Sequence, residues 1–109
     1  MQDRRSAFLI AYLDDVPMGC GALRTYSDDI AEIKRVYAKT NKVGVAHHII
    51  AALEKKAVVN GFHIVQLETR KVNTHAIQFY LNCGYSVIPN YGKYVERDEA
   101  ICFSKRLDS

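Results

Sequence analysis

The sequence predicts a single domain, residues 1–109, with an α/β (α+β) fold. We expect a mixed, mostly antiparallel central sheet that contains a parallel βαβ unit, with two helices packed on it. Three observations support this fold class. The chain has 109 residues, of which 49% are hydrophobic, which suits one modest core. Its apolar residues come mostly in short runs of roughly 4 to 8, as strands do. One amphipathic stretch is followed at once by such a run, which is the order of a βαβ unit.

The first two strands are expected over Ala7–Leu13 and Met18–Tyr26. The segment between them, Asp14-Asp15-Val16-Pro17, has turn-forming residues, so the two runs predict a β-hairpin. Gly19 and Gly21 weaken the second strand because glycine adds no side chain for packing. They therefore indicate a bulge or a close backbone neighbour.

A third strand is expected over Ala31–Ala38, after a turn at Ser27-Asp28-Asp29. Apolar residues then recur at helical spacing, which predicts an amphipathic helix from Val45 to about Asn60 that ends at Gly61. The apolar run His63–Thr69 follows directly. This strand, helix and strand together predict a parallel pair with a right-handed crossover.

The last part of the chain predicts a shorter helix and two strands. Asn73 or Thr74 can cap this helix, and Gly84 ends it. The final two strands are expected over Tyr85–Ile88 and Ala100–Lys105. A polar, tyrosine-bearing loop, Pro89–Glu99, separates them.

Composition argues against several classes of protein. The net charge is +3, and the 15 basic residues are interspersed with 12 acidic ones, so we expect no nucleic-acid partner and no anionic membrane surface. No apolar run approaches the ~20 residues of a membrane span, and no leader is recognisable, which predicts a soluble cytoplasmic protein. Cys20, Cys83 and Cys102 have no paired spacing and predict reduced core thiols. His47 and His48 are adjacent, so they point in different directions on a helix and predict no metal site.

The turn before the long helix, Asn41-Lys42-Val43-Gly44-Val45-Ala46, is a candidate anion site. A helix start leaves N–H groups unpaired and carries partial positive charge. Gly44 and Ala46 allow an anion to approach the backbone, and Lys42 adds charge. The alternative is that Gly44 only serves a tight turn. Neither GxxxxGK[ST] nor GxGxxG is present, which argues against nucleotide hydrolysis and hydride transfer.

Ordered segments along the chain resemble those of one family, the GNAT superfamily of acyltransferases. N-K-V-G-V-A resembles its Q/R-x-x-G-x-G/A segment, with Asn41 in place of glutamine or arginine. Asn73-x-x-Ala76-x-x-x-Tyr80-x-x-x-Gly84-Tyr85 is similar to the N-x-x-A-x-x-x-Y-x-x-x-G-[FY] pattern of its later helix. Ala31–Tyr37 resembles its central strand, and the chain's ending resembles its last hairpin. The resemblance covers about Ala7 to Leu107.

The resemblance implies direct transfer of an acetyl group from acetyl-CoA, as cosubstrate, to an amine of a small molecule or peptide, without a covalent enzyme intermediate. A backbone N–H near Val36 would polarise the thioester carbonyl. The turn from Val43 to Ala46 would hold the diphosphate. The implied cofactor-binding residues are Val36, Ala38, Asn41, Lys42, Val43, Gly44, Val45, Ala46, His47, Asn73 and Tyr80.

Two side chains have implied catalytic roles. Tyr80 occupies the position of a general acid that donates a proton to the departing thiolate. Its alternative is a core tyrosine with a satisfied hydroxyl. Glu32 is in the place of a base that deprotonates the amine through water. Its alternative is a surface glutamate that forms a salt bridge with Lys34.

Three further residues have open roles. Asn73 can hydrogen-bond the cofactor or only cap its helix. Tyr91 and Tyr94 can contact the acceptor or belong to a solvated loop.

The family's fold ordinarily begins with a strand and one or two helices before the hairpin that opens this sequence. We therefore expect an open sheet edge, and either a fragment or a chain that completes itself by self-association, as in a homodimer. The leading hypothesis is an N-acetyltransferase. The alternative is a non-catalytic acyl-CoA-binding or partner-binding module, which the departure at Asn41 favours. A nucleic-acid-binding domain has only the mild positive charge in its favour.

Overall fold

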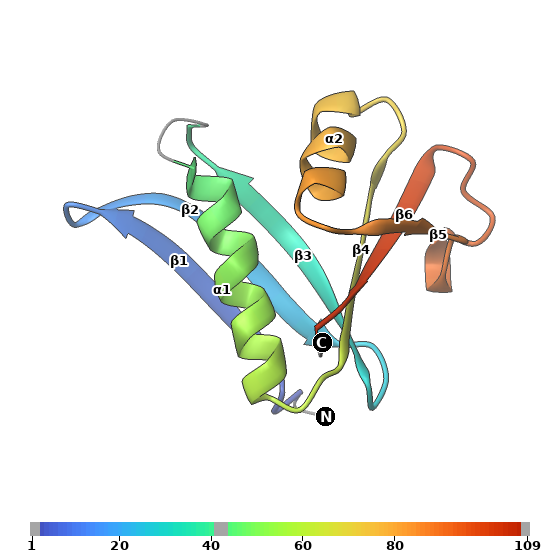
Figure 1. The fold of residues 1–109 in the computed structure, drawn as a ribbon, viewed down its shortest axis with the longest axis horizontal. Coiled ribbons are helices and arrows are strands. Elements are labelled where there is room, and N and C mark those ends of the chain that lie inside the picture. The colour runs from blue at the N-terminus through green and yellow to red at the C-terminus, as the bar shows by residue number, and fades with distance from the viewer. Residues whose placement is uncertain (1–2, 41–43, 108–109) are drawn as a thin grey trace.

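The computed structural model describes residues 3–40 and 44–107, which form one six-stranded sheet and two α-helices (Figure 1). A short 3₁₀ helix, η2 (Gly92–Tyr94), lies in the loop before the last strand. The other elements, in chain order, are β1 (Ala7–Leu13), β2 (Val16–Thr25), β3 (Ile30–Ala38), α1 (Val45–Val59), β4 (Ile64–Arg70), α2 (Thr74–Asn82), β5 (Ser86–Ile88) and β6 (Ala100–Arg106).

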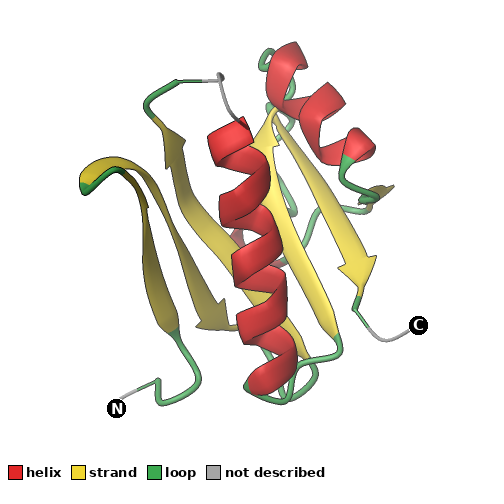
Figure 2. Cartoon of the chain, turned by 60° about the vertical axis from the view of Figure 1, so that its left-hand side comes forward, coloured by secondary structure: helices red, strands yellow, loops and turns green. Residues whose placement is uncertain are grey.

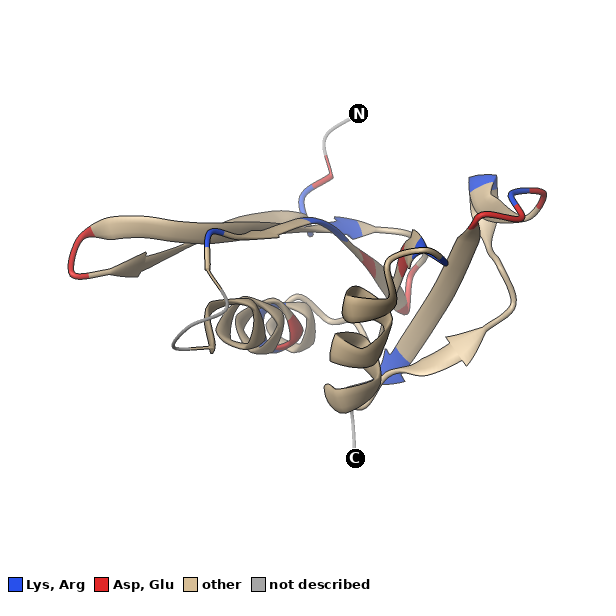
Figure 3. Cartoon of the chain, turned by 90° about the horizontal axis from the view of Figure 1, so that it is seen from above, with Lys and Arg blue, Asp and Glu red and all other residues tan. Residues whose placement is uncertain are grey.

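The sheet has the strand order β1-β2-β3-β4-β6-β5. Strands β3 and β4 are parallel and joined by α1, whereas the other neighbours are antiparallel. Both helices lie on the same side of the sheet (Figure 3). The predicted fold class, a mostly antiparallel sheet with one parallel βαβ unit, is therefore confirmed.

Helix α1 packs its apolar face on β1, β2 and β3. The buried positions recur every three or four residues, which is the period of an α-helix: Val45, Ile49, Ile50, Leu53 and Ala57. The helix ends as expected, since Gly61 takes a positive φ of 91° just beyond it. Figure 2 shows the N-terminal end of α1 at the same end of the sheet as α2.

Both glycines of β2 lie directly beneath α1. A Cβ on Gly19 would stand 2.5 Å from the carbonyl oxygen of Tyr37, and one on Gly21 would stand 2.8 Å from side-chain atoms of Ile49 and Leu53. The register of β2 against β3 also shifts within this strand. The sequence predicted a bulge or a close neighbour here, and the structure has both.

The hairpin turn is shorter than predicted. Asp14 and Asp15 both have positive φ, 51° and 67°, and form a two-residue turn that lets Val16 pair with Leu13. Strand β2 therefore begins two residues before the expected Met18. The other element boundaries agree with the predicted ones to within a residue or two.

Strands β3 and β4 separate after a short paired stretch. Their pairing ends at Glu32 and Gln66, and the two strands then diverge toward α2 (Figure 1). Arg35 has a φ of +57°, which is rare for a residue with a side chain, opposite the register shift between Cys20 and Ala22 of β2. This bulge in β3 accompanies the separation.

Two further findings bear on the sequence-based expectations. All three cysteines have free thiols, but only Cys102 is buried, whereas Cys20 and Cys83 are half-buried. Among the described residues, no helix is long and apolar enough to cross a membrane.

Candidate functional site

The separation of β3 from β4 leaves a slot in the sheet. Its cavity, of about 270 Å³, is lined by both strands and by residues of α2 and its cap, among them Val36, Leu67, Asn73 and Tyr80. Beyond Glu32, the edge of β3 that faces β4 pairs with no strand of residues 3–40 and 44–107. Backbone polar groups need partners, so a ligand with amide groups can pair with this edge.

A second, larger cavity adjoins the slot on the helix side of the sheet. It has a volume of about 560 Å³ and shares Val36, Asn73, Ala76 and Tyr80 with the slot. Its other lining residues come from the end of β3, the start of α1 and α2: Ala38, Gly44, Ala46, His47, His75 and Phe79. The N-terminus of α1 and the slot therefore open into one space.

The described residues at the N-terminus of α1 leave its backbone open to an anion. Gly44 precedes the helix with a φ of 66°, no described side chain caps it, and the first turn has no acidic residue. A Cβ on Gly44 would have no heavy atom of the described residues within 4 Å. Helix α2 differs, because Asn73 Oδ1 accepts a hydrogen bond of 3.1 Å from the N–H of Ala76.

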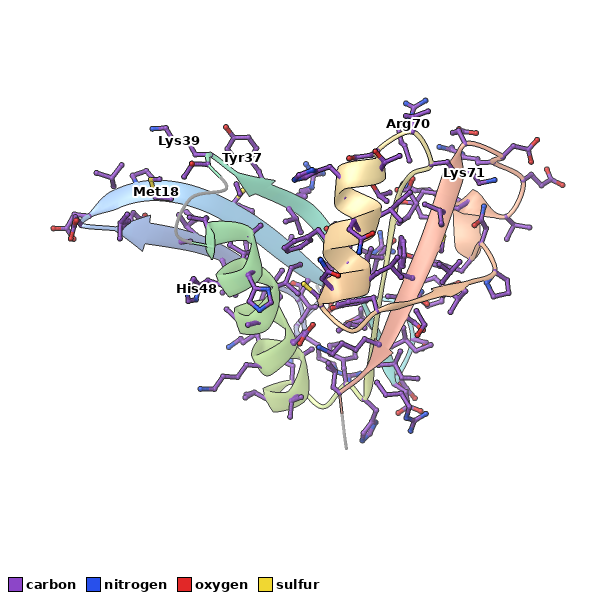
Figure 4. All side chains as sticks on the ribbon, turned by 45° about the horizontal axis from the view of Figure 1, so that its top comes forward. Met18, Tyr37, Lys39, His48, Arg70 and Lys71 are labelled. Atoms are coloured by element: carbon purple, nitrogen blue, oxygen red, sulfur yellow. The ribbon has the colours of Figure 1, made fainter. Side chains whose placement is uncertain are left out.

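Positive side chains flank the wide end of the slot. In Figure 4, Lys39 projects from the end of β3, and Arg70 and Lys71 project from the end of β4 on the same edge of the molecule. An anionic ligand that entered from this edge would therefore meet cations on both sides.

The predicted cofactor-binding residues divide into three groups. Seven of them line the cavity on the helix side: Val36, Ala38, Gly44, Ala46, His47, Asn73 and Tyr80. Val45 does not, because its side chain is buried beneath α1 and lines a separate apolar groove of about 680 Å³ between α1 and β1. The predicted positions Asn41, Lys42 and Val43 lie outside the described residues.

The two histidines point in different directions, as the sequence predicted. His48 lines the apolar groove, whereas His47 faces α2. Nδ1 of His47 lies 3.7 Å from the sulfur of Cys83, and its ring meets that of Phe79 edge-on at 6.4 Å. Sequence reasoning missed Phe79 and His75 as lining residues, since neither belongs to the motif that identified Tyr80.

Tyr80 belongs to the core and also borders the slot and the larger cavity. Its ring belongs to the core and packs against Tyr85 and Phe103, at centroid distances of 5.8 and 6.0 Å. It also lines both the slot and the larger cavity. Burial, with a smaller contribution from Cys83, raises the pKa of Tyr80 to about 12. The phenol is therefore protonated at neutral pH.

Glu32 is buried, so its interpretation as a surface residue is wrong, although its pairing with Lys34 is present. Only 4% of Glu32 is exposed. The Tyr91 hydroxyl donates a hydrogen bond of 2.7 Å to its Oε2. Arg24 Nε lies 3.4 Å and Lys34 Nζ 3.9 Å from its Oε1. Sequence reasoning named neither Arg24 nor Tyr91 as its partner.

A third cavity, of about 250 Å³, surrounds Glu32. Glu32 alternates along β3 with Ala31 and Ile33 of the core that α1 covers, so it faces the opposite side of the sheet. Lys34 lines both this cavity and the slot. The slot and this cavity therefore adjoin at Lys34. Tyr91 and Tyr94 line the cavity, which makes the loop a wall of the site.

A buried donor lies at the point where the strands separate. Gln66 pairs with Glu32 in the parallel register and is 4% exposed. Its Nε2 has no hydrogen-bond partner within the described part of the chain. A buried, unpaired donor costs about 1–3 kcal/mol. A water molecule bound to Nε2 would reduce that cost.

Solved structures with the same fold are known, although a search of curated proteins finds no match. A protein assigned as an acyl-CoA N-acyltransferase from Klebsiella pneumoniae is 25% identical, with a TM-score of 0.90 over 99% of this chain and 77% of that one. A GNAT acetyltransferase from Elizabethkingia anophelis with acetyl-CoA bound has a TM-score of 0.79 at 15% identity, over 94% and 76% of the two chains. PaiA N-acetyltransferase from Thermoplasma acidophilum, in complex with coenzyme A, has a TM-score of 0.79 at 21% identity, over 93% and 60%.

The family comparison agrees with the fold and with the motifs. The model of the Acetyltransferase (GNAT) family matches residues 1–85, which include the uncapped start of α1, the separated strands and Tyr80. This chain therefore belongs to the GNAT acetyltransferase family.

Proposed function

We propose that this protein is an N-acetyltransferase that transfers an acetyl group from acetyl-CoA to an amine of a small molecule or peptide. One observation carries the proposal: Tyr80 lies where the slot between β3 and β4 meets the cavity at the uncapped start of α1. The bound acetyl-CoA and coenzyme A in two structures of the same fold support it.

The described residues fit the cosubstrate. The N-terminus of α1 from Gly44 to His47 would hold the diphosphate, since its N–H groups lack a side-chain cap. The unpaired edge of β3 at Val36 and Ala38 would pair with the amide groups of the pantetheine arm. Asn73 already uses its Oδ1 as a helix cap, so it would contribute mainly to the shape of the cavity.

Acetyl-CoA would supply the acetyl group as a thioester. In the transfer, the amine nitrogen bonds to the carbonyl carbon as the carbon–sulfur bond breaks. Glu32 would accept the amine proton through water. A backbone N–H near Val36 would stabilise negative charge on the carbonyl oxygen, and the Tyr80 hydroxyl would donate a hydrogen bond to the departing sulfur.

The raised pKa of Tyr80 favours a hydrogen bond to the sulfur over full transfer of the proton. A free thiol has a pKa of about 8.5, so complete proton transfer from a phenol of pKa about 12 to a thiolate would be uphill by ~5 kcal/mol. A hydrogen bond that strengthens as charge develops on sulfur avoids this cost. Tyr80 would thus stabilise the leaving group while it remains protonated.

A non-catalytic acyl-CoA-binding module is the second candidate. Glu32 favours it, because this carboxylate already has a hydrogen bond from Tyr91 and the charges of Arg24 and Lys34 beside it. These partners surround its oxygens, which leaves less room for a water that would relay the amine proton. The two candidates share the cofactor site and differ in turnover.

We also propose a cytoplasmic homodimer. The free thiols of all three cysteines support a reducing compartment. The exposed apolar side chains of β1, namely Phe8, Ile10 and Tyr12, support association through this edge strand.

A calorimetric titration with acetyl-CoA, beside free CoA and ADP, tests the cofactor site. We expect micromolar affinity with CoA compounds preferred over ADP. An acceptor screen that monitors thiol release then separates the enzyme from the binding module. Absence of binding would contradict both candidates, whereas binding without turnover of any acceptor would favour the module.

A further inference from the structure

The cavity around Glu32 has an excess of positive charge. Its lining residues include three cations, Arg24, Lys34 and Lys93, but a single carboxylate, that of Glu32. Glu32 already accepts a hydrogen bond from Tyr91 and lies close to Arg24. Lys34 also lies 3.9 Å from Glu32, so Arg24 and Lys34 share one carboxylate, and Lys93 has no carboxylate partner among the residues that line this cavity.

Lys34 shows the consequence most clearly. Only 25% of its side chain is exposed. Burial lowers its pKa, the charge of Glu32 opposes that effect, and the like charges of Lys93 and Arg24 lower the pKa further. An anion bound between Lys34 and Lys93 would relieve this repulsion.

Aromatic rings make the rest of the cavity small and well defined. Tyr91 meets Tyr26 and Tyr94 edge-on, at centroid distances of 5.2 and 5.5 Å. Lys93 Nζ lies 5.5 Å from the ring centroid of Tyr94. The volume of about 250 Å³ corresponds to roughly eight water molecules at ~30 Å³ each. That space suits a molecule of amino-acid size better than a folded peptide.

We propose that the acceptor is a small zwitterion, an amine with a carboxylate or phosphate group, whose anionic end binds between Lys34 and Lys93 while its amine faces Glu32. This inference rests on the proposed acetyltransferase function and names its acceptor class. Lys34 lines both this cavity and the slot, so an acceptor bound here lies next to the place where transfer would occur.

Charge also argues against other amines. A simple monoamine or a polyamine adds positive charge to a cavity that already has more cations than anions. A zwitterion adds none, and its two ends find complementary partners. An acceptor with a carboxylate and one with a phosphate group share this chemistry, and the experiment below distinguishes between them.

The test compares matched acceptors on the full chain: amino acids, their carboxamides, which keep the amine but lack the negative charge, and the corresponding aminophosphonates. We expect kcat/KM to be at least about tenfold higher for the amino acids or the aminophosphonates than for the carboxamides. The better of the two anionic series identifies the group. Equal values for all three series would overturn the proposal while leaving the acetyltransferase function intact.

A variant tests the position of the anionic group. Lys93 is exposed, so Lys93→Gln is expected to fold. This variant should raise KM for the anionic acceptors about tenfold or more. The KM for the carboxamides and the affinity for acetyl-CoA should stay nearly unchanged. Lys55→Gln, at an exposed lysine of α1, is the matched control and should change neither. An unchanged KM in Lys93→Gln would contradict the proposal.

A binding experiment that needs no turnover distinguishes the acceptor proposal from the acetyltransferase proposal. Titration of the same amino acids and carboxamides into the chain, followed by NMR shifts of residues in β3 and η2, needs no acetyl-CoA. Preference for the amino acids that Lys93→Gln abolishes would support the acceptor class even if acetyl-CoA failed to bind. Equal or absent binding of both series would overturn it.

Discussion

Tyr80 packs into the core with its ring and borders the reaction space, and both properties follow from its place on the short helix α2. One turn earlier, Ala76 leaves room for the slot, while Tyr85 and Phe103 enclose the ring from the other side. The burial that raises its pKa also keeps the phenol protonated. A residue of this kind can donate a hydrogen bond at any physiological pH.

Tyr80→Phe should therefore separate catalysis from binding. We expect kcat to fall roughly 10²-fold or more, in line with the usual effect of removing one hydrogen-bond donor from developing negative charge, while the affinity for acetyl-CoA changes little. Steady-state kinetics and calorimetry measure the two effects. Tyr12→Phe, at an exposed tyrosine of β1, is the control and should retain full activity. An unchanged kcat in Tyr80→Phe would exclude the donor role.

The same residue predicts a pH dependence. An unfolded tyrosine ionises near pH 10, whereas Tyr80 in the fold stays neutral up to about pH 12. Its contribution to the free energy of unfolding is thus complete below about pH 10 and is lost as pH rises toward 12, by about 2–3 kcal/mol. The difference between tyrosinate absorbance titrations of wild type and Tyr80→Phe should show one group with a midpoint near 12. A midpoint near 10 would mean that the hydroxyl is solvated.

Gly44 tests the diphosphate site. Gly44→Glu should abolish detectable binding of acetyl-CoA, because a carboxylate at the helix start would repel the diphosphate. No heavy atom of the described chain would lie within 4 Å of the new Cβ, so the fold should survive with only the cost of the left-handed φ. Gly44→Asn is the matched control, since asparagine tolerates this conformation without charge. Calorimetry that found retained affinity in Gly44→Glu would place the diphosphate elsewhere.

At the scale of elements, α1 lies close to β2 because β2 has no side chains at Gly19 and Gly21. The two positions differ in what a methyl group would meet. At Gly19 the nearest atom is a backbone oxygen of Tyr37 at 2.5 Å, whereas at Gly21 the nearest atoms belong to the side chains of Ile49 and Leu53. Side chains can shift more readily than a paired strand.

Gly19→Ala should consequently destabilise the fold by about 1–3 kcal/mol or more, and Gly21→Ala by less. Urea denaturation of the two variants measures the difference in the free energy of unfolding. Equal decreases in the free energy of unfolding would show that the backbone of β3 shifts as readily as the side chains of Ile49 and Leu53.

The elements themselves were largely predictable, because the periodicity of α1 and the apolar runs of the strands depend on local sequence. The separation of β3 and β4 was not, since it accompanies a bulge at Arg35 that no local pattern marks. The partners of Glu32 were also beyond local reasoning: Tyr91 is 59 residues away in sequence. Glu32 becomes buried when the loop after β5, which carries Tyr91, folds over β3. The motifs and the tyrosine-bearing loop indicated residues that line the cavities, whereas the contacts of Glu32 with Tyr91 and Arg24 depend on tertiary structure and were missed.

At the scale of the whole molecule, β1 is an edge strand with none of the usual protection against pairing. Its sequence from Ala7 to Leu13 has no charge, and Phe8, Ile10 and Tyr12 are 58%, 47% and 62% exposed. Its two ends differ in charge: Asp3, Arg4 and Arg5 precede it, with a net charge of one positive, and the pair of aspartates at the hairpin tip follows it (Figure 3). A second copy that paired antiparallel to β1 would bring each basic end beside an acidic one.

This arrangement predicts a dimer whose affinity falls as salt concentration rises, since the paired ends attract by exposed charges. Ile10→Lys would introduce two like charges near the two-fold axis and should give a monomer. Val95→Lys, at a 63% exposed valine of the loop after β5, adds the same charge away from β1 and should remain dimeric. Sedimentation velocity over a range of protein concentrations distinguishes these states. A wild-type chain that stayed monomeric at high concentration would show that the β1 edge does not pair with its own copy.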